Sequence, residues 1–64
     1  MIAVQLRLSD NILETVLVNP AHIVTVRSNA PGVGSIINLA HGHGTLYVEE
    51  TQSDIFDRIM EIRR

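Results

Sequence analysis

The stretch that decides the fold runs from Ser35 to Glu49 and reads SIINLA-HGHG-TLYVE. Two runs of β-prone residues flank a short segment in which Gly42 and Gly44 can adopt the positive φ angles that tight turns require. The pattern predicts a β-hairpin whose turn begins at His41. The hairpin register is expected to place four apolar side chains beneath a C-terminal helix: Ile37, Leu39, Leu46 and Val48.

The residues before the hairpin predict three more strands. Residues 2–8 alternate apolar and polar side chains, which is typical of a strand with one buried and one exposed face. The turn formers Ser9-Asp10-Asn11 follow, and a second strand is expected over Leu13–Val18. Asn19-Pro20 ends that strand because proline has no N–H for the ladder. A third strand is expected over His22–Ser28, before a loop rich in proline and glycine.

The second strand carries apolar side chains on both faces. Leu13 and Leu17 share one face with Thr15, whereas Val16 and Val18 share the other. Such a strand is typically covered twice, here by the core on one side and by the helix or another subunit on the other. Since the chain has only 64 residues and is 45% apolar, we expect a homo-oligomer joined by strand edges or by this apolar excess.

The period of the apolar residues changes after Glu50. Ile55, Ile59 and Ile62 recur at helical spacing, and Phe56 and Met60 would widen the stripe. A helix is therefore predicted from Gln52 to Arg63, with one face covering the sheet.

The predicted helix has signals at both ends. Thr51 and Asp54 form a short version of the capping box, and the acidic residues nearby suit the positive end of the helix dipole. Arg63 and Arg64 suit the other end. The elements together predict a single α+β domain that is mainly β, with about five antiparallel strands in a curled sheet or small barrel and one C-terminal amphipathic helix.

Composition excludes several classes of site. The chain has no cysteine, so it has no disulfide and no thiolate ligand or nucleophile. Seven acidic residues against five arginines give a net charge of −2, which argues against a broad phosphate-binding surface. No signal peptide or apolar run long enough to span a bilayer is apparent. We expect a soluble cytoplasmic protein with no cofactor, no membrane insertion and an unknown protein partner.

Catalytic motifs are not apparent. Ser28, Ser35, Glu14 and three histidines are present, but no motif brings a nucleophile, a base and an orienting acid together. The Gly32-Val33-Gly34 segment precedes a strand, whereas a phosphate-binding loop needs a helix N-terminus behind it. The sequence therefore predicts a non-catalytic protein-interaction or regulatory module rather than an enzyme.

A small nucleic-acid-binding regulator is the first alternative. Arg7 lies on the exposed face of the first strand and Arg27 near the end of the third, so the two could form a small basic patch. Both are equally explained as solvated strand residues. Tyr47 and Phe56 are the only aromatic residues, and Phe56 belongs to the helix stripe, so no platform for stacking bases is predicted.

A metal-binding protein that uses His41 and His43 is the second alternative. Two imidazoles two residues apart can share a metal ion, but a stable zinc site needs three or four ligands. His22 is the remaining histidine. Polar turn residues are the simpler interpretation, so no metal site is assigned.

One family resemblance is visible. The segment Val16-Leu17-Val18-Asn19-Pro20-Ala21-His22-Ile23, the glycine hairpin and Tyr47-Val48-Glu49-Glu50-Thr51 together resemble the short FlbD-type (swarming motility) flagellar proteins of bacteria. The same features are also similar to part of the LytTR class of DNA-binding β-domains. The first resemblance implies a non-enzymatic accessory protein that acts through protein contacts in flagellar motility, and it transfers no functional residues. Because the chain departs from the family in having no lysine and a longer turn at His41–Gly44, a phage-encoded protein of similar fold is the alternative origin.

Overall fold

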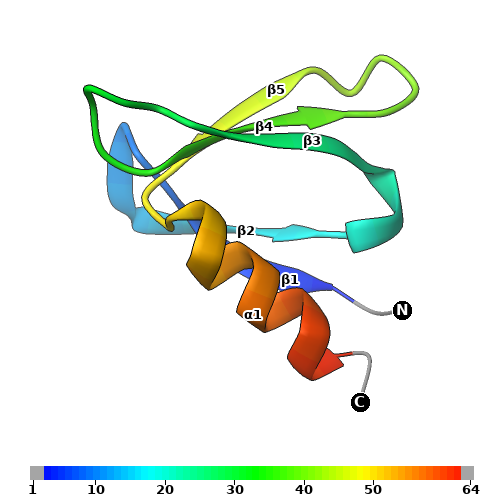
Figure 1. Cartoon of the computed structure of the whole chain (residues 1–64). Coiled ribbons are helices and arrows are strands. Elements are labelled where there is room, and N and C mark those ends of the chain that lie inside the picture. Colours follow the sequence, from blue (N-terminus) through cyan, green and yellow to red (C-terminus); the bar gives the residue numbers. More distant parts are fainter. Residues whose placement is uncertain (1–2, 63–64) are drawn as a thin grey trace.

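The computed structural model describes residues 3–62, which form five strands, one short 3-10 helix and one α-helix (Figure 1). In chain order these elements are β1 (Val4–Leu8), β2 (Asn11–Val18), η1 (Pro20–His22), β3 (Ile23–Ser28), β4 (Ser35–Leu39), β5 (Thr45–Val48) and α1 (Gln52–Ile62). No helix among the described residues is long and apolar enough to span a membrane.

The strands form one antiparallel sheet in the order β2-β1-β5-β4-β3. The sheet is curled but unclosed, so the expected fold class is confirmed and the open form is the one adopted. Its two edge strands, β2 and β3, follow one another in the chain and are joined through η1. The side chain of Asn19 caps that short helix by accepting a hydrogen bond from the Ala21 N–H at 2.9 Å.

Two strand limits differ from the sequence-based expectation. β2 begins at Asn11, two residues before the predicted Leu13, because Asn11 already pairs with Leu8; the register shift between Arg7 and Leu8 leaves the extra residues 12–14 on β2. β3 begins at Ile23 rather than His22, because Pro20 suits the first turn of a helix and the chain completes a 3-10 turn first. The predicted strand at residue 2 lies outside the described residues.

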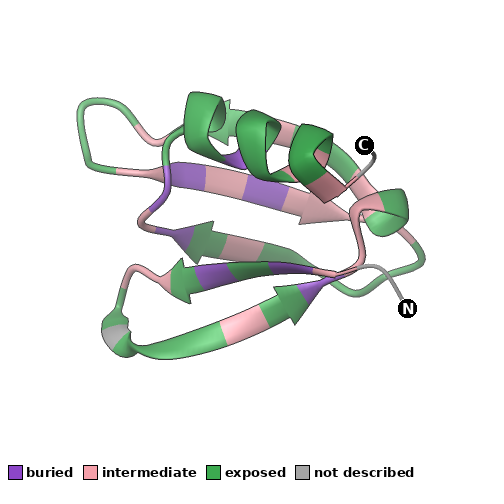
Figure 2. Cartoon of the chain, turned by 90° about the horizontal axis from the view of Figure 1, so that it is seen from below, coloured by how far each residue is buried: buried purple, intermediate pink, exposed green. Residues whose placement is uncertain are grey.

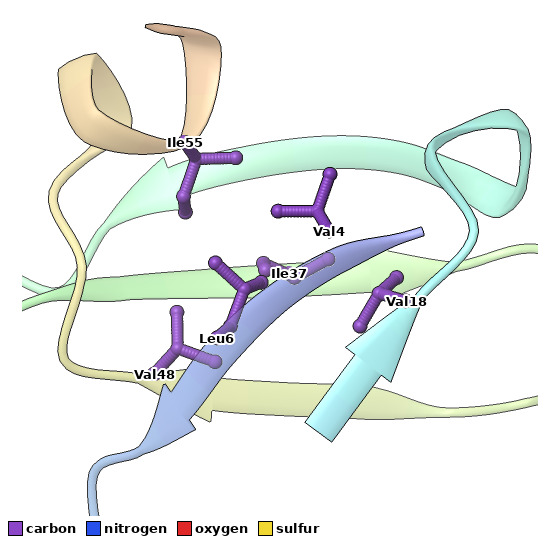
Figure 3. Close-up of a cluster of buried hydrophobic side chains, with 6 residues drawn as sticks. All are labelled: Val4, Leu6, Val18, Ile37, Val48 and Ile55. Carbon is purple, nitrogen blue, oxygen red and sulfur yellow. The ribbon is translucent and has the colours of Figure 1, made fainter. Parts of the chain in front are cut away.

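Six apolar side chains form the core, and they come from every layer of the fold (Figure 3). They are Val4, Leu6, Val18, Ile37, Val48 and Ile55. Ile55 is the buried helix residue and points into the curled sheet, where α1 approaches β1 and β3. Leu39 and Leu46 are only partly buried at the margin of this core, so the expected placement beneath the helix holds most fully for Ile37 and Val48.

The predicted width of the helix stripe is wrong. Ile59 and Ile62 pack against the core as expected, but Phe56 is 63% exposed and Met60 is 44% exposed. Figure 2 shows the outer side of α1 as largely exposed. A helix that crosses the opening of a curled sheet presents only a narrow stripe to the core, and Phe56 and Met60 lie beside that stripe.

The predicted start of the helix is confirmed. The Asp54 N–H donates to the Thr51 hydroxyl at 3.1 Å, and the Thr51 N–H donates to the Asp54 carboxylate at 3.5 Å. This reciprocal pair is a capping box with aspartate in the acidic position. Arg63 and Arg64, expected at the other end, lie outside the described residues.

Positive φ angles define the β4–β5 turn, as predicted for Gly42 (φ 73°) and Gly44 (φ 88°). Gly34 also has a positive φ, of 85°, at the entry to β4. A Cβ atom at Gly34 would collide with the Val48 carbonyl oxygen and lie 3.0 Å from the Cα atom of Glu49. The close approach of β4 to the end of β5 therefore depends on glycine at this position.

We predict that Gly34→Ala destabilises the protein by at least about 2 kcal/mol more than Gly42→Ala, as measured by urea unfolding. Both substitutions place alanine at a positive φ, but a Cβ atom at Gly42 meets nothing within 4 Å. Gly42→Ala is therefore a matched control for the cost of the backbone angle alone. Equal losses would show that β4 does not need the close approach at Gly34.

Candidate functional site

The weakest junction in the sheet is between β1 and β5. Leu8 and Val48 are the one pair of residues that lie opposite each other in the ladder between these two strands. The Ser9 N–H donates to the Tyr47 carbonyl and the Glu49 N–H donates to the Arg7 carbonyl, each at 2.9 Å. Beyond this point β5 ends, and the edge of β1 that carries the backbone groups of Gln5 and Arg7 has no strand beside it.

Where β5 ends, side chains form the hydrogen bonds to the backbone of β1 that a neighbouring strand would otherwise form. The buried Glu50 carboxylate, only 7% exposed, accepts the Arg7 N–H through both oxygens, at 3.0 and 3.2 Å. Arg58 from α1 donates to Glu50 Oε2 at 3.0 Å and to the Gln5 carbonyl at 2.7 Å. An ion pair thus satisfies the edge of β1 that β5 leaves open.

Glu50 is tied to β4 as well. The buried Ser35 hydroxyl donates to the Glu50 carbonyl at 2.8 Å. Among residues 3–62, no buried side-chain nitrogen or oxygen lacks a hydrogen-bond partner. We refer to Glu50, Arg58 and Ser35 as the seam cluster. It links β1, β4 and α1 at the place where the sheet would otherwise open.

A groove of about 440 Å³ lies beside the seam cluster. Its walls carry charges of both signs, from Arg7 and Arg58 and from Glu50 and Glu61. The Glu50 carboxylate is engaged by donors from β1 and α1, so it is occupied in holding the fold together and is a poor general base.

Arg7 and Arg27, the two candidate nucleic-acid-binding residues, are both exposed but lie apart. Arg7 is on β1 and Arg27 on β3, with β5 and β4 between them. Three inter-strand spacings correspond to roughly 14 Å on a flat sheet. Glu49 is directly across from Arg7 on the β5 side, since its N–H donates to the Arg7 carbonyl. The structure therefore does not gather the two arginines into one patch.

All three histidines meet at one end of the sheet, which the sequence did not predict. The ring of His22 is 5.9 Å from that of His41, edge to face, and 6.0 Å from that of His43, nearly parallel. The contact is supported by the backbone, because the Ala40 N–H donates to the His22 carbonyl at 2.8 Å. As positioned, no group of three or more His, Cys, Asp or Glu residues among those described could hold a metal ion.

An open hollow of about 340 Å³ adjoins His22 and His43. Its remaining lining is almost entirely apolar and comes from the ends of β2, β4 and β5: Val16, Leu17, Val18, Asn19, Leu39 and Leu46. Val16, Leu39 and Leu46 of this lining pack against the core.

β2 carries the most exposed large apolar side chain among the described residues. Leu13 is 91% exposed and Leu17 is 64% exposed, whereas Val18 on the opposite face is buried. β2 pairs only with β1, so its second edge has no partner strand. Leu17 is exposed and the adjacent Val18 is buried, as expected for a strand with apolar residues on both faces, but Leu17 is not covered within the described chain.

Sequence reasoning missed the seam cluster. Glu50 looks like one of several acidic residues near a helix start, and Arg58 looks like a solvated helix residue; indeed it remains 46% exposed. The partners that give both residues their role lie on β1, more than forty positions away. No local spacing identifies such contacts.

Comparisons with known proteins add no family to this description. A scan of protein-family models, a search of curated proteins and a search of solved structures each found no match to the chain.

We predict that Glu50→Gln lowers the free energy of unfolding by roughly 2–4 kcal/mol, because an amide replaces a carboxylate that accepts from Arg7 and Arg58 in a buried position. The control is Glu61→Gln, which removes an exposed carboxylate from the same groove and is expected to change stability by less than about 0.5 kcal/mol. Chemical denaturation followed by circular dichroism measures both variants. Equal stability of the two would refute the structural role of Glu50.

Proposed function

We propose that this protein is a non-catalytic interaction module that recruits another protein strand along the edge of β2. The observation that carries the proposal is an edge strand of eight residues that pairs with β1 alone and carries two strongly exposed leucines. An exposed, apolar strand edge is the kind of surface to which a further strand adds. Backbone hydrogen bonds supply affinity in such a complex, and alternate side chains supply specificity.

The direction of the backbone groups on β2 supports the proposal. In β1, Gln5 and Arg7 direct their backbone groups away from β2, toward Arg58, Glu50 and Glu49. Val4 and Leu6, which alternate with them, therefore bond to their register partners Val18 and Val16 on β2. Thr15 and Leu17, on either side of Val16, direct their own N–H and C=O groups away from β1.

The other sheet edge is less open. Gln52 at the start of α1 donates its side-chain amide to the Val26 carbonyl of β3 at 2.9 Å. A helix that covers part of an edge is a common way to prevent strand addition. The difference between the two edges makes β2 the favoured docking surface.

The biological setting that fits such a module is an accessory role in flagellar motility or in a phage-encoded system. The support for that setting is the resemblance of residues 16–23 and 47–51 to the FlbD-type proteins, which implies action through protein contacts.

We predict that the protein self-associates at micromolar concentration and that Leu17→Lys returns it to the monomer, as measured by light scattering coupled to size exclusion. A lysine on the outer face leaves the fold intact but places like charges in the interface. Val33→Lys is the matched control, because Val33 is 72% exposed and lies in the β3–β4 loop. A wild-type monomer at all concentrations would contradict self-association, and equal effects of the two lysines would contradict the use of the β2 edge.

A further inference from the structure

We propose that His22, His41 and His43 bind one divalent transition-metal ion of the kind that prefers imidazole nitrogen, such as Zn²⁺. The site lies where η1 meets the β4–β5 turn, at one end of the sheet (Figure 1). It gathers every histidine of the chain. The inference is separate from the proposed strand-docking function and does not depend on it.

The spacing of the rings is close to that of imidazoles that share a metal ion. A tetrahedral ion with nitrogen ligands at about 2.0–2.1 Å holds the centres of the imidazole rings roughly 5 Å apart. The ring centre of His22 is 5.9 Å from that of His41 and 6.0 Å from that of His43. As positioned the three side chains do not form a metal site, so binding involves rotation of the rings, all of which are exposed.

The imidazole rings are free to rotate because no described partner holds them. None of the side-chain hydrogen bonds between described residues involves an imidazole. The ion pair within residues 3–62 joins Arg58 and Glu50, so no carboxylate there is paired with a histidine. A neutral imidazole binds a metal ion through its unprotonated nitrogen, and that nitrogen is therefore available on each ring.

The backbone already holds the three residues together. The Ala40 N–H donates to the His22 carbonyl at 2.8 Å, and the His43 N–H donates to the Ala40 carbonyl at 3.3 Å. His41 has a left-handed backbone with φ 58°, which glycine would adopt at lower cost. The ligands thus come from a closed turn and the short helix bonded to it, so binding orders side chains and leaves the backbone in place.

The surroundings admit a cation. The open hollow of about 340 Å³ beside His22 and His43 gives an ion and its water ligands access to the rings. No arginine lines this hollow, so no fixed positive charge opposes the ion there.

The donor atoms select the class of metal ion. The chain has no cysteine, and no carboxylate lines the hollow, so imidazole nitrogens and water are the ligands on offer. Imidazole suits Zn²⁺, Cu²⁺ and Ni²⁺, whereas Mg²⁺ and Ca²⁺ require oxygen ligands. Three histidines with water in the fourth position are an established arrangement for Zn²⁺.

Titration of the metal-free, untagged chain with zinc chloride at neutral pH tests the site. We expect isothermal calorimetry and native mass spectrometry to find one ion per chain. We also expect the NMR resonances of all three imidazole rings to shift together. Magnesium chloride is expected to produce neither effect.

Substitutions identify the ligands. His22→Gln, His43→Gln and His41→Asn are each expected to weaken zinc binding by at least about tenfold, since loss of even a group that orients a ligand commonly costs about 10–100-fold. Asparagine is chosen at His41 because it tolerates a positive φ. Ala21→Gln is the matched control: it introduces the same side chain as His22→Gln at the next exposed residue of η1, and zinc affinity should not change. Circular dichroism checks that each variant is folded.

The outcomes are distinct. Weaker binding in all three histidine variants, with Ala21→Gln unchanged, would support the site. Zinc affinity that is unchanged in His22→Gln would overturn it, because the two turn histidines would then suffice. Absence of one-to-one binding of Zn²⁺, Ni²⁺ and Cu²⁺ to the wild-type chain would overturn it as well. None of these results alters the test of the β2 edge, which is the oligomeric state.

Discussion

The fold depends on the Glu50 carboxylate more than on any other polar group. In the described residues, five short strands and one helix of eleven residues enclose a core of only six buried apolar side chains. A domain of this size has little stability to lose. The junction between β1 and β5 is its weakest point, and there Glu50 accepts the Arg7 N–H while Arg58 satisfies the Gln5 carbonyl. The ion pair completes the ladder with side chains.

This arrangement explains how α1 is positioned. The capping box at Thr51 and Asp54 starts the helix directly after Glu50. Arg58, two turns into the helix, returns to the same carboxylate. The helix is thereby held across the opening of the curled sheet, with Ile55 directed into the core (Figure 3). Partly exposed charged side chains contribute little to the free energy of unfolding on their own. Arg58 therefore stabilises the fold mainly through its ion pair with the buried Glu50.

The seam cluster satisfies the edge of β1, but one edge of β2 has no partner strand. The β1–β5 junction is sealed by the seam cluster, and part of β3 is covered by Gln52, but β2 keeps a free edge and two exposed leucines. The same strand contributes Val18 to the core from its other face. A mutation that opens the sheet at Glu50 would therefore disturb β1 and, through it, the strand on which the proposed interaction depends.

Much of the fold could be predicted because its signals are local. Alternation in β1, the glycines of the hairpin turn and the Thr51–Asp54 cap each act within a few residues, and all are observed.

Contacts between distant residues could not be predicted in this way. The partner of Glu50 on β1 and the meeting of His22 with the hairpin turn depend on how the sheet curls. The exposure of Phe56 has the same cause, because curvature sets how much of the helix meets the core. The exposed leucines of β2 could be predicted only in part. Their separation from the core-facing valines follows from the local sequence, but whether the helix covers them does not.

Hydrogen exchange of the Arg7 amide, followed by NMR, tests the central role of Glu50 most directly. The Arg7 N–H has a side chain as its partner where a strand would normally supply one. We predict that it exchanges within about tenfold of the rate of the Leu6 amide, which lies in the β1–β2 ladder, after correction for intrinsic rates. Exchange as fast as that of the Asp10 amide in the adjacent turn would show that Glu50 does not close the seam.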